Sequence, residues 1–119
     1  MLTLMRDQLH QPLVVVDVGC LSGFADVWLQ LGNRVQLIGF DPDEDECERL
    51  RKHYQQHSNI PVVPVALGSS AGSKVLHLTR QAASSSFYRP DPAILNARPS
   101  MRHNLQIVGE AQVELTTLD

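Results

Sequence analysis

The sequence predicts an α/β fold in which a parallel βαβαβ unit is followed by antiparallel strands. Residues 13–23 form an apolar run that ends in an acid and two glycines, as is typical of a buried parallel strand leading into a ligand-binding turn. Two further apolar runs, Val35–Phe40 and residues 62–67, are separated by segments long enough for helices. Beyond Ser69 apolar residues alternate with polar ones, which favours antiparallel strands.

The composition is that of one small globular domain spanning residues 1–119. Hydrophobic residues make up 43% of the chain, which is enough to build a core. The net charge of -3 and the lack of a basic block argue against nonspecific binding to nucleic acid or to an acidic membrane. We expect a cytoplasmic protein, because no segment resembles a signal peptide or a membrane span and Cys20 and Cys47 indicate neither a zinc site nor a disulfide framework.

Helices are predicted on both sides of the first strand. The first is a short amphipathic helix before Pro12, whose apolar residues recur at three- and four-residue spacing: Leu2, Met5 and Leu9. We expect this opening helix to cover an edge or a face of the sheet. The second follows the glycine turn and has an apolar stripe at helical period: Phe24, Val27, Trp28 and Leu31. Gly32 and Asn33 are expected to end it.

The second strand, Val35–Phe40, is expected to lead into another amphipathic helix. Asp41 or Asp43 can cap this helix, and Pro42 suits its first turn. Acids lie mainly near its start and bases later, as the helix dipole favours. The predicted buried side carries Cys47, Leu50 and Tyr54.

The rest of the chain is predicted to be mostly strands. Pro64 cannot donate a hydrogen bond, so the third strand, residues 62–67, is expected to lie at an edge or to be only partly paired. The crossovers of the parallel unit are expected to be right-handed. Residues 74–79 and 106–115 alternate and are predicted as antiparallel strands, and the polar, proline-containing stretch between them is expected to be a mobile loop.

The glycine turn at residues 19–23 does not match the motifs that bind phosphate. A dinucleotide fold needs G-x-G-x-x-G, and Leu21 stands in the place of the middle glycine. A P-loop is excluded, because Gly72-Ser73-Lys74 lacks the remaining spacing and the strand-loop-helix context. These departures disfavour a nicotinamide dinucleotide or a nucleoside triphosphate as the ligand.

S-adenosylmethionine carries no phosphate, and two acids suit its groups. Asp17, beside the turn, suits the cationic methionine part, directly or through water. Asp41, at the end of the second strand, can accept hydrogen bonds from both ribose hydroxyls. An acid also binds ribose in NAD enzymes, so Asp41 alone does not discriminate. Two structural alternatives to ligand binding stay open: the turn is only a connection between strand and helix, or Asp41 is only a helix cap.

Five motifs occur in one order along the chain: VDVGCLSG at 16–23, FDPD at 40–43, PVALG at 64–68, SSSFY at 84–88 and LTTLD at 115–119. This ordered set resembles the FkbM family of S-adenosylmethionine-dependent methyltransferases. The resemblance implies a Rossmann-like class I methyltransferase fold and the O-methylation of a hydroxyl on a sugar or natural product. It also implies a set of cofactor-binding residues: Asp17, Gly19, Cys20 and Gly23 at the methionine part, Asp41 at the ribose, and Ala66 at the adenine.

Two features depart from the family's pattern. Family members usually have Ala-Asn where this chain has Cys20 and Leu21, so an apolar side chain replaces a polar one near the cofactor. The family's domain also continues after the Leu-Asp at 118–119, so the resemblance covers the first part of that fold only. We therefore expect a partial domain, or one that needs a partner chain or self-association to cover its sheet. The alternative to an active enzyme is a noncatalytic cofactor-binding remnant or assembly module.

No residue is predicted to be catalytic, and no metal site is expected. Four histidines lack a partner acid at informative spacing and are expected on the surface or in strands: His53, His57, His77 and His103. Residues 84–86 are three serines that form either a solvated turn or, by the resemblance, a segment near the active site. Cys20 is expected to be a packing residue, because methyl transfer from a sulfonium needs no covalent intermediate.

Overall fold

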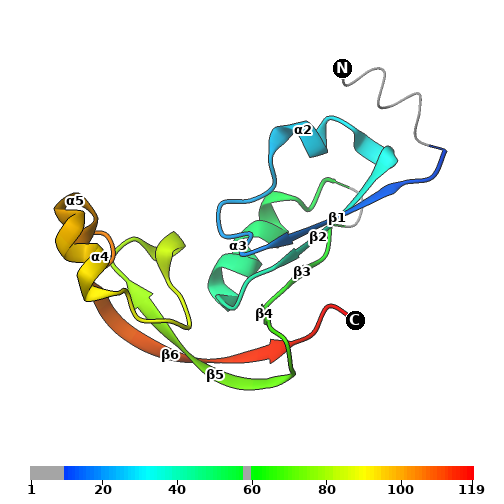
Figure 1. The fold of residues 1–119 in the computed structure, drawn as a ribbon. Coiled ribbons are helices and arrows are strands. Elements are labelled where there is room, and N and C mark those ends of the chain that lie inside the picture. The colour runs from blue at the N-terminus through cyan, green and yellow to red at the C-terminus, as the bar shows by residue number, and fades with distance from the viewer. Residues whose placement is uncertain (1–9, 58–59) are drawn as a thin grey trace. The chain divides into compact units, whose positions relative to one another are not determined.

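The computed structural model describes residues 10–57 and 60–119, which form a mixed α/β structure. The chain divides into two units, Met1–Leu67 and Gly68–Asp119, and Figure 1 traces the elements of each. The predicted opening helix with Leu2, Met5 and Leu9 lies outside the described residues. The assignment of the whole chain to one domain stays a prediction.

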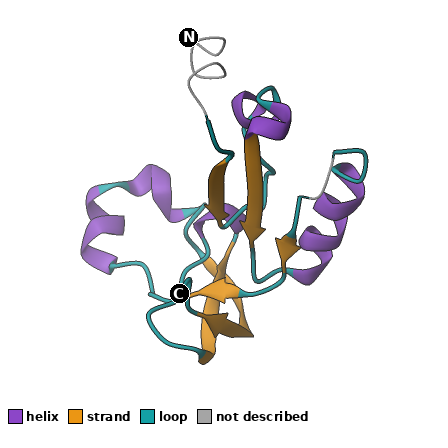
Figure 2. Cartoon of the chain, turned by 90° about the vertical axis from the view of Figure 1, so that its right-hand side faces the viewer, coloured by secondary structure: helices purple, strands orange, loops and turns teal. Residues whose placement is uncertain are grey.

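The first unit contains the predicted parallel sheet. Its strands are β1 (Leu13–Val18), β2 (Val35–Phe40) and β3 (Val62–Val63), in the order β1-β2-β3. The arrows of the three strands point the same way in Figure 2. β1 and β2 pair along their whole length, from Leu13 opposite Val35 to Val18 opposite Phe40. This register brings the ends of both strands, and the turns that follow them, to one edge of the sheet.

β1 differs from the buried strand that its apolar run predicts. It lies at the outer position of the described sheet and pairs there only with β2. Val14 is 53% exposed and Val18 is 59% exposed, and both lie on the face of the sheet opposite to Val15 and Leu37, which pack in the core. A continuous apolar run indicates a parallel strand, but it does not reveal whether both neighbours of that strand are present.

The helix after the glycine turn is shorter than predicted. α2 spans only Asp26–Leu29, because Ala25 is extended and the chain tightens into a short 3-10 helix, η1 (Gly32–Arg34). Gly32 has a φ of +55°, in agreement with its predicted role as a stop signal. Phe24 and Leu31 are buried as the apolar stripe predicts, although both lie outside the helix.

The second predicted helix is confirmed. α3 spans Glu44–His53, and its acidic first turn and basic last turn suit the helix dipole. Asp43 is the N-cap, because its side chain accepts a hydrogen bond from the Glu46 N–H at 3.1 Å. Pro42 therefore precedes the cap, and the prediction that it lies in the first helical turn is wrong.

The core of the first unit lies between the sheet and α3. Its buried members include the three residues predicted for that helix face and side chains from the glycine turn and strands: Cys20, Phe24, Leu37, Cys47, Leu50, Tyr54 and Val62. The predicted third strand is broken, because Val65 donates its N–H back to the Val63 carbonyl at 2.9 Å beside Pro64. Only β3 pairs with β2, and β4 (Ala66–Leu67) follows the break, so the expected partial pairing is confirmed.

The second unit contains the predicted antiparallel strands, β5 (Gly72–Thr79) and β6 (Ile107–Thr116). The segment between them, expected to be a loop, contains three short helices: η2 (Ala82–Ser84), α4 (Pro92–Ala97) and α5 (Pro99–Arg102). Asp91 caps α4 by accepting from the Ala93 N–H, so a polar, proline-containing stretch here begins a helix. No helix within residues 10–57 and 60–119 is long and apolar enough to cross a membrane.

Candidate functional site

The glycine turn after β1 is tied to the end of β2 by its backbone. The N–H groups of Gly19 and Cys20 both donate to the Phe40 carbonyl, at 2.7 and 3.2 Å. Gly19 has a φ of +78°, and a Cβ at this position would meet no atom within 4 Å, so its backbone faces open space. The turn is thus a fixed element at the carboxyl edge of the sheet, which is where α/β folds bind their ligands.

The far end of the turn is held by α3 and by Tyr54, which directly follows that helix. Gly23 has a φ of +85°, and a Cβ there would overlap the hydroxyl of Tyr54, so glycine is required on both counts. The Phe24 N–H donates to that hydroxyl at 2.9 Å in a buried setting. On the surface, Nη2 of Arg49 donates to the Leu21 carbonyl at 3.1 Å. The sequence pattern predicted Tyr54 as a core residue only. Neither hydrogen bond could be predicted from neighbouring residues, because each joins positions far apart in the sequence.

Asp41 is a buried acid with a fixed backbone. It is 6% exposed, its N–H donates to the Val63 carbonyl at 3.2 Å, and its own carbonyl accepts from the Cys47 thiol at 3.3 Å. Its Oδ1 atom accepts from the Asp43 N–H at 2.9 Å. Burial raises the pKa of the Asp41 carboxyl above its ordinary value, while the backbone N–H groups of Asp43 and Leu21 act in the opposite direction. Asp41 therefore braces the entry to α3, although the N-cap itself is Asp43.

Asp17 lies in the neighbouring strand, near the same edge of the sheet. It is half-buried in β1 and pairs with Gly39, two residues before Asp41. The pKa of the Cys20 thiol is raised to about 12. Burial is the largest cause, and the charges of Asp41, Cys47 and Asp17 add to it. The thiol therefore stays protonated, and its burial confirms the predicted packing role. The two acids give this edge of the sheet a negative potential.

Most of the backbone donors of the turn are already used inside the protein. Gly19, Cys20, Gly23 and Phe24 all donate within the unit, and the Leu21 N–H acts on the Asp41 carboxylate. A phosphate-binding turn instead directs its N–H groups outward at the anion. The donor arrangement, like the two acids, is unsuited to a pyrophosphate.

The structure brings five of the six predicted cofactor-binding residues to one edge of the sheet: Asp17, Gly19, Cys20, Gly23 and Asp41. Ala66 is buried in β4, beyond the break at Pro64, and takes no part in the hydrogen bonds that join these residues in the described ranges. Gly39 belongs to the cluster but was not predicted. A glycine inside a strand pattern signals close approach, and here a Cβ on Gly39 would lie 2.7 Å from the Cys20 Sγ.

The serines and histidines have structural partners. Ser85 Oγ accepts from the Thr79 N–H and Ser86 Oγ accepts from the Tyr88 N–H, both at 3.1 Å, so these two serines stabilise the turn. His77 lies in strand β5, one of the two placements expected for the histidines, and its Nδ1 lies 3.0 Å from Glu110 on β6, a partner acid that spacing along the sequence did not indicate. In the described part of the chain no three acids, cysteines or histidines gather in a way that would hold a metal ion.

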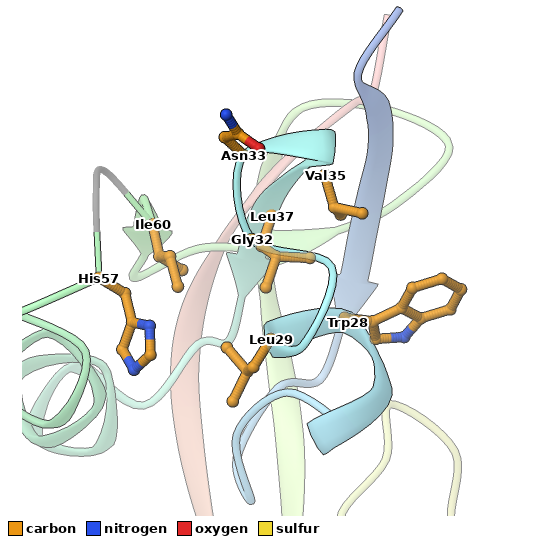
Figure 3. Close-up of a pocket in the computed structure, with 8 residues that line it drawn as sticks. All are labelled: Trp28, Leu29, Gly32, Asn33, Val35, Leu37, His57 and Ile60. Carbon is orange, nitrogen blue, oxygen red and sulfur yellow. The ribbon is translucent and has the colours of Figure 1, made fainter. Parts of the chain in front are cut away.

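A small pocket lies elsewhere in the first unit. Its walls come from α2, η1, the first half of β2 and the side chains of His57 and Ile60 (Figure 3). Val35 and Leu37 line it, whereas Asp41 follows the opposite end of that strand. The pocket is therefore at the other end of β2 from the glycine turn, and the candidate site rests on the turn and its acids. No protein-family model, curated protein or solved structure matches the chain.

Proposed function

We propose that this chain is an S-adenosylmethionine-binding domain of a Rossmann-like class I methyltransferase of the FkbM type, which transfers a methyl group to a hydroxyl of a sugar or natural product. The observation that carries the proposal is the placement of Asp17 and Asp41 at the ends of adjacent parallel strands, on either side of a turn with two positive-φ glycines. Ligand sites of open α/β sheets occur at this edge.

The charges and donors of the site suit a cationic ligand without phosphate. Asp17 would hold the ammonium of the methionine part, and the negative edge balances the sulfonium. A carboxylate has about four acceptor positions, and Asp41 uses its Oδ1 for Asp43 and interacts with Leu21. The remaining acceptor positions suit the ribose hydroxyls. By the resemblance, Ala66 and its neighbours would contact the adenine.

The chemistry needs few protein groups. S-adenosylmethionine supplies an electrophilic methyl group, and the contribution of this chain is to hold the cofactor still and to exclude water. The ties from the turn to Phe40, Tyr54 and Arg49 supply that rigidity. Cys20, buried and protonated, offers no nucleophile.

Calorimetric titration with S-adenosylmethionine tests the proposal. Asp41→Asn should raise the dissociation constant by roughly tenfold to a hundredfold, the range of a hydrogen bond to a charged group. Asp45→Asn is the matched control, because Asp45 is an exposed acid in the first turn of α3, four residues after Asp41, and lies outside the site. NAD should not bind. A folded wild-type chain without measurable S-adenosylmethionine binding would overturn the proposal.

The exposed edge of β1 supports a second candidate, a cofactor-binding remnant or assembly module that does not methylate. For this candidate, β1 would pair with a second copy of the chain through its free edge. Val14 and Val18 on β1 are exposed. Methyl transfer by the isolated chain to a panel of sugar hydroxyls separates the two candidates. Turnover by the monomer would exclude the second candidate, and cofactor binding without turnover would favour it.

A further inference from the structure

Tyr54 has a hydroxyl group that its place in the core does not require. The residue follows α3 directly, is 5% exposed, and its ring contacts Phe24 edge to face with the ring centroids 5.6 Å apart. A phenylalanine would fill the same space. The hydroxyl instead accepts the Phe24 N–H at 2.9 Å. A buried hydroxyl is costly unless it is bonded, so its presence here is informative.

This hydrogen bond fixes the Gly23–Phe24 end of the turn, which is not bonded to β2. The near end of the turn is fixed by the two bonds to Phe40, whereas Gly23 and Phe24 lie beyond them. The N–H of Phe24 precedes the first turn of α2, which begins at Asp26, so it has no helical partner. Tyr54 satisfies this donor, and its hydroxyl occupies the space that a side chain at residue 23 would need.

We propose that Tyr54 is a positioning residue that holds the Gly23–Phe24 end of the turn in the conformation that receives the methionine part of the cofactor. This inference rests on the proposed function. Asp41, braced separately by Asp43 and Val63, serves the ribose end. The two ends of the ligand are therefore controlled through different contacts, and one end can be weakened without the other.

Tyr54→Phe tests this separation, with S-adenosylmethionine and methylthioadenosine as probes. Methylthioadenosine keeps the adenosine and the sulfur but lacks the amino acid portion. We expect the dissociation constant of S-adenosylmethionine to rise about two- to tenfold, the net strength of one hydrogen bond, while that of methylthioadenosine stays unchanged. Tyr88→Phe is the control, because Tyr88 is 77% exposed in the second unit and should alter neither constant.

The outcomes distinguish this inference from the proposed function. If the wild-type chain binds neither probe, the proposed function fails and the inference with it. If the wild type binds both, and Tyr54→Phe changes neither constant or weakens both equally, only the inference is overturned, because general loosening of the core does not discriminate between the probes. If Tyr54→Phe does not fold, Phe24→Leu is a second test, because it keeps both the backbone N–H and the Tyr54 hydroxyl. Its selectivity between the two probes should equal that of the wild type. A selective loss of S-adenosylmethionine binding would contradict the inference.

Discussion

Cys20 and Gly39 fit against each other where the glycine turn crosses the central strand. A Cβ on Gly39 would lie 2.7 Å from the Cys20 Sγ and 3.2 Å from the ring of Phe24. The turn therefore approaches β2 as closely as it does because residue 39 has no side chain. The same residue pairs with Asp17 of β1 and lies two positions before Asp41, so the contact lies between the two acids of the site.

Gly39→Ala should consequently destabilise the protein by about 1 to 3 kcal/mol, the usual cost of overpacking a core. Cys20→Ala should recover part of this loss in the double variant, because it removes the nearest atom. Gly109→Ala is the control, since the nearest atom to a Cβ there is 3.8 Å away in ordinary contact. Urea unfolding measures the wild type, the two single variants, the double variant and Gly109→Ala. Equal effects at residues 39 and 109 would contradict the close approach.

The raised pKa of Asp41 gives opposite pH trends for stability and for ligand binding. Burial favours the protonated carboxyl in the folded state, so the folded chain binds more protons than the unfolded chain above the ordinary pKa of 3.8. The contribution of Asp41 to stability is therefore present below that value and is lost as the pH rises through its folded pKa. Asp41→Asn should become more stable relative to the wild type over this rise, as thermal unfolding across a pH series would reveal.

Cofactor binding should respond in the other direction. The ribose hydroxyls need an ionised acceptor, so the affinity of the wild type for S-adenosylmethionine should increase as Asp41 loses its proton, and Asp41→Asn should lack this increase. Titration calorimetry at several pH values, on both proteins, measures the difference. Parallel pH profiles for the two proteins would show that Asp41 does not contact the ligand.

The thiols of the core should be inert. Cys20 and Cys47 are free and buried, and burial is the first cause of the raised pKa of each. We expect iodoacetamide at pH 8 to label neither in the folded protein and both in urea, as mass spectrometry would detect, because the thiolate is the reactive form. Rapid labelling of Cys20 in the native state would mean that the turn opens. In that case the proposed fixed site would lose its basis.

Local patterns predicted the frame of the site better than its internal contacts. The bounds of β2 agree with the predicted strand, because a continuous apolar run is followed at once by capping residues. The five site residues at the sheet edge follow from that strand and the glycine turn. The Tyr54–Phe24 and His77–Glu110 contacts join residues 30 and 33 positions apart, so they depend on the packing of whole elements. The exposure of β1 likewise depends on its neighbours.

The edge of β1 leads to the last prediction, which concerns association. β1 pairs only with β2 in the described sheet, so its other side presents unpaired backbone groups beside Val14, which is 53% exposed. Such an edge is a template for another strand, and a lysine on it opposes pairing. We expect the wild-type chain to self-associate with rising concentration in sedimentation velocity runs, and Val14→Lys to shift it towards the monomer. Val108→Lys is the control, because Val108 is 57% exposed in β6 of the other unit. A wild type that is monomeric at every concentration, or an equal effect of both lysines, would exclude pairing through β1 and leave the site to function in a single chain.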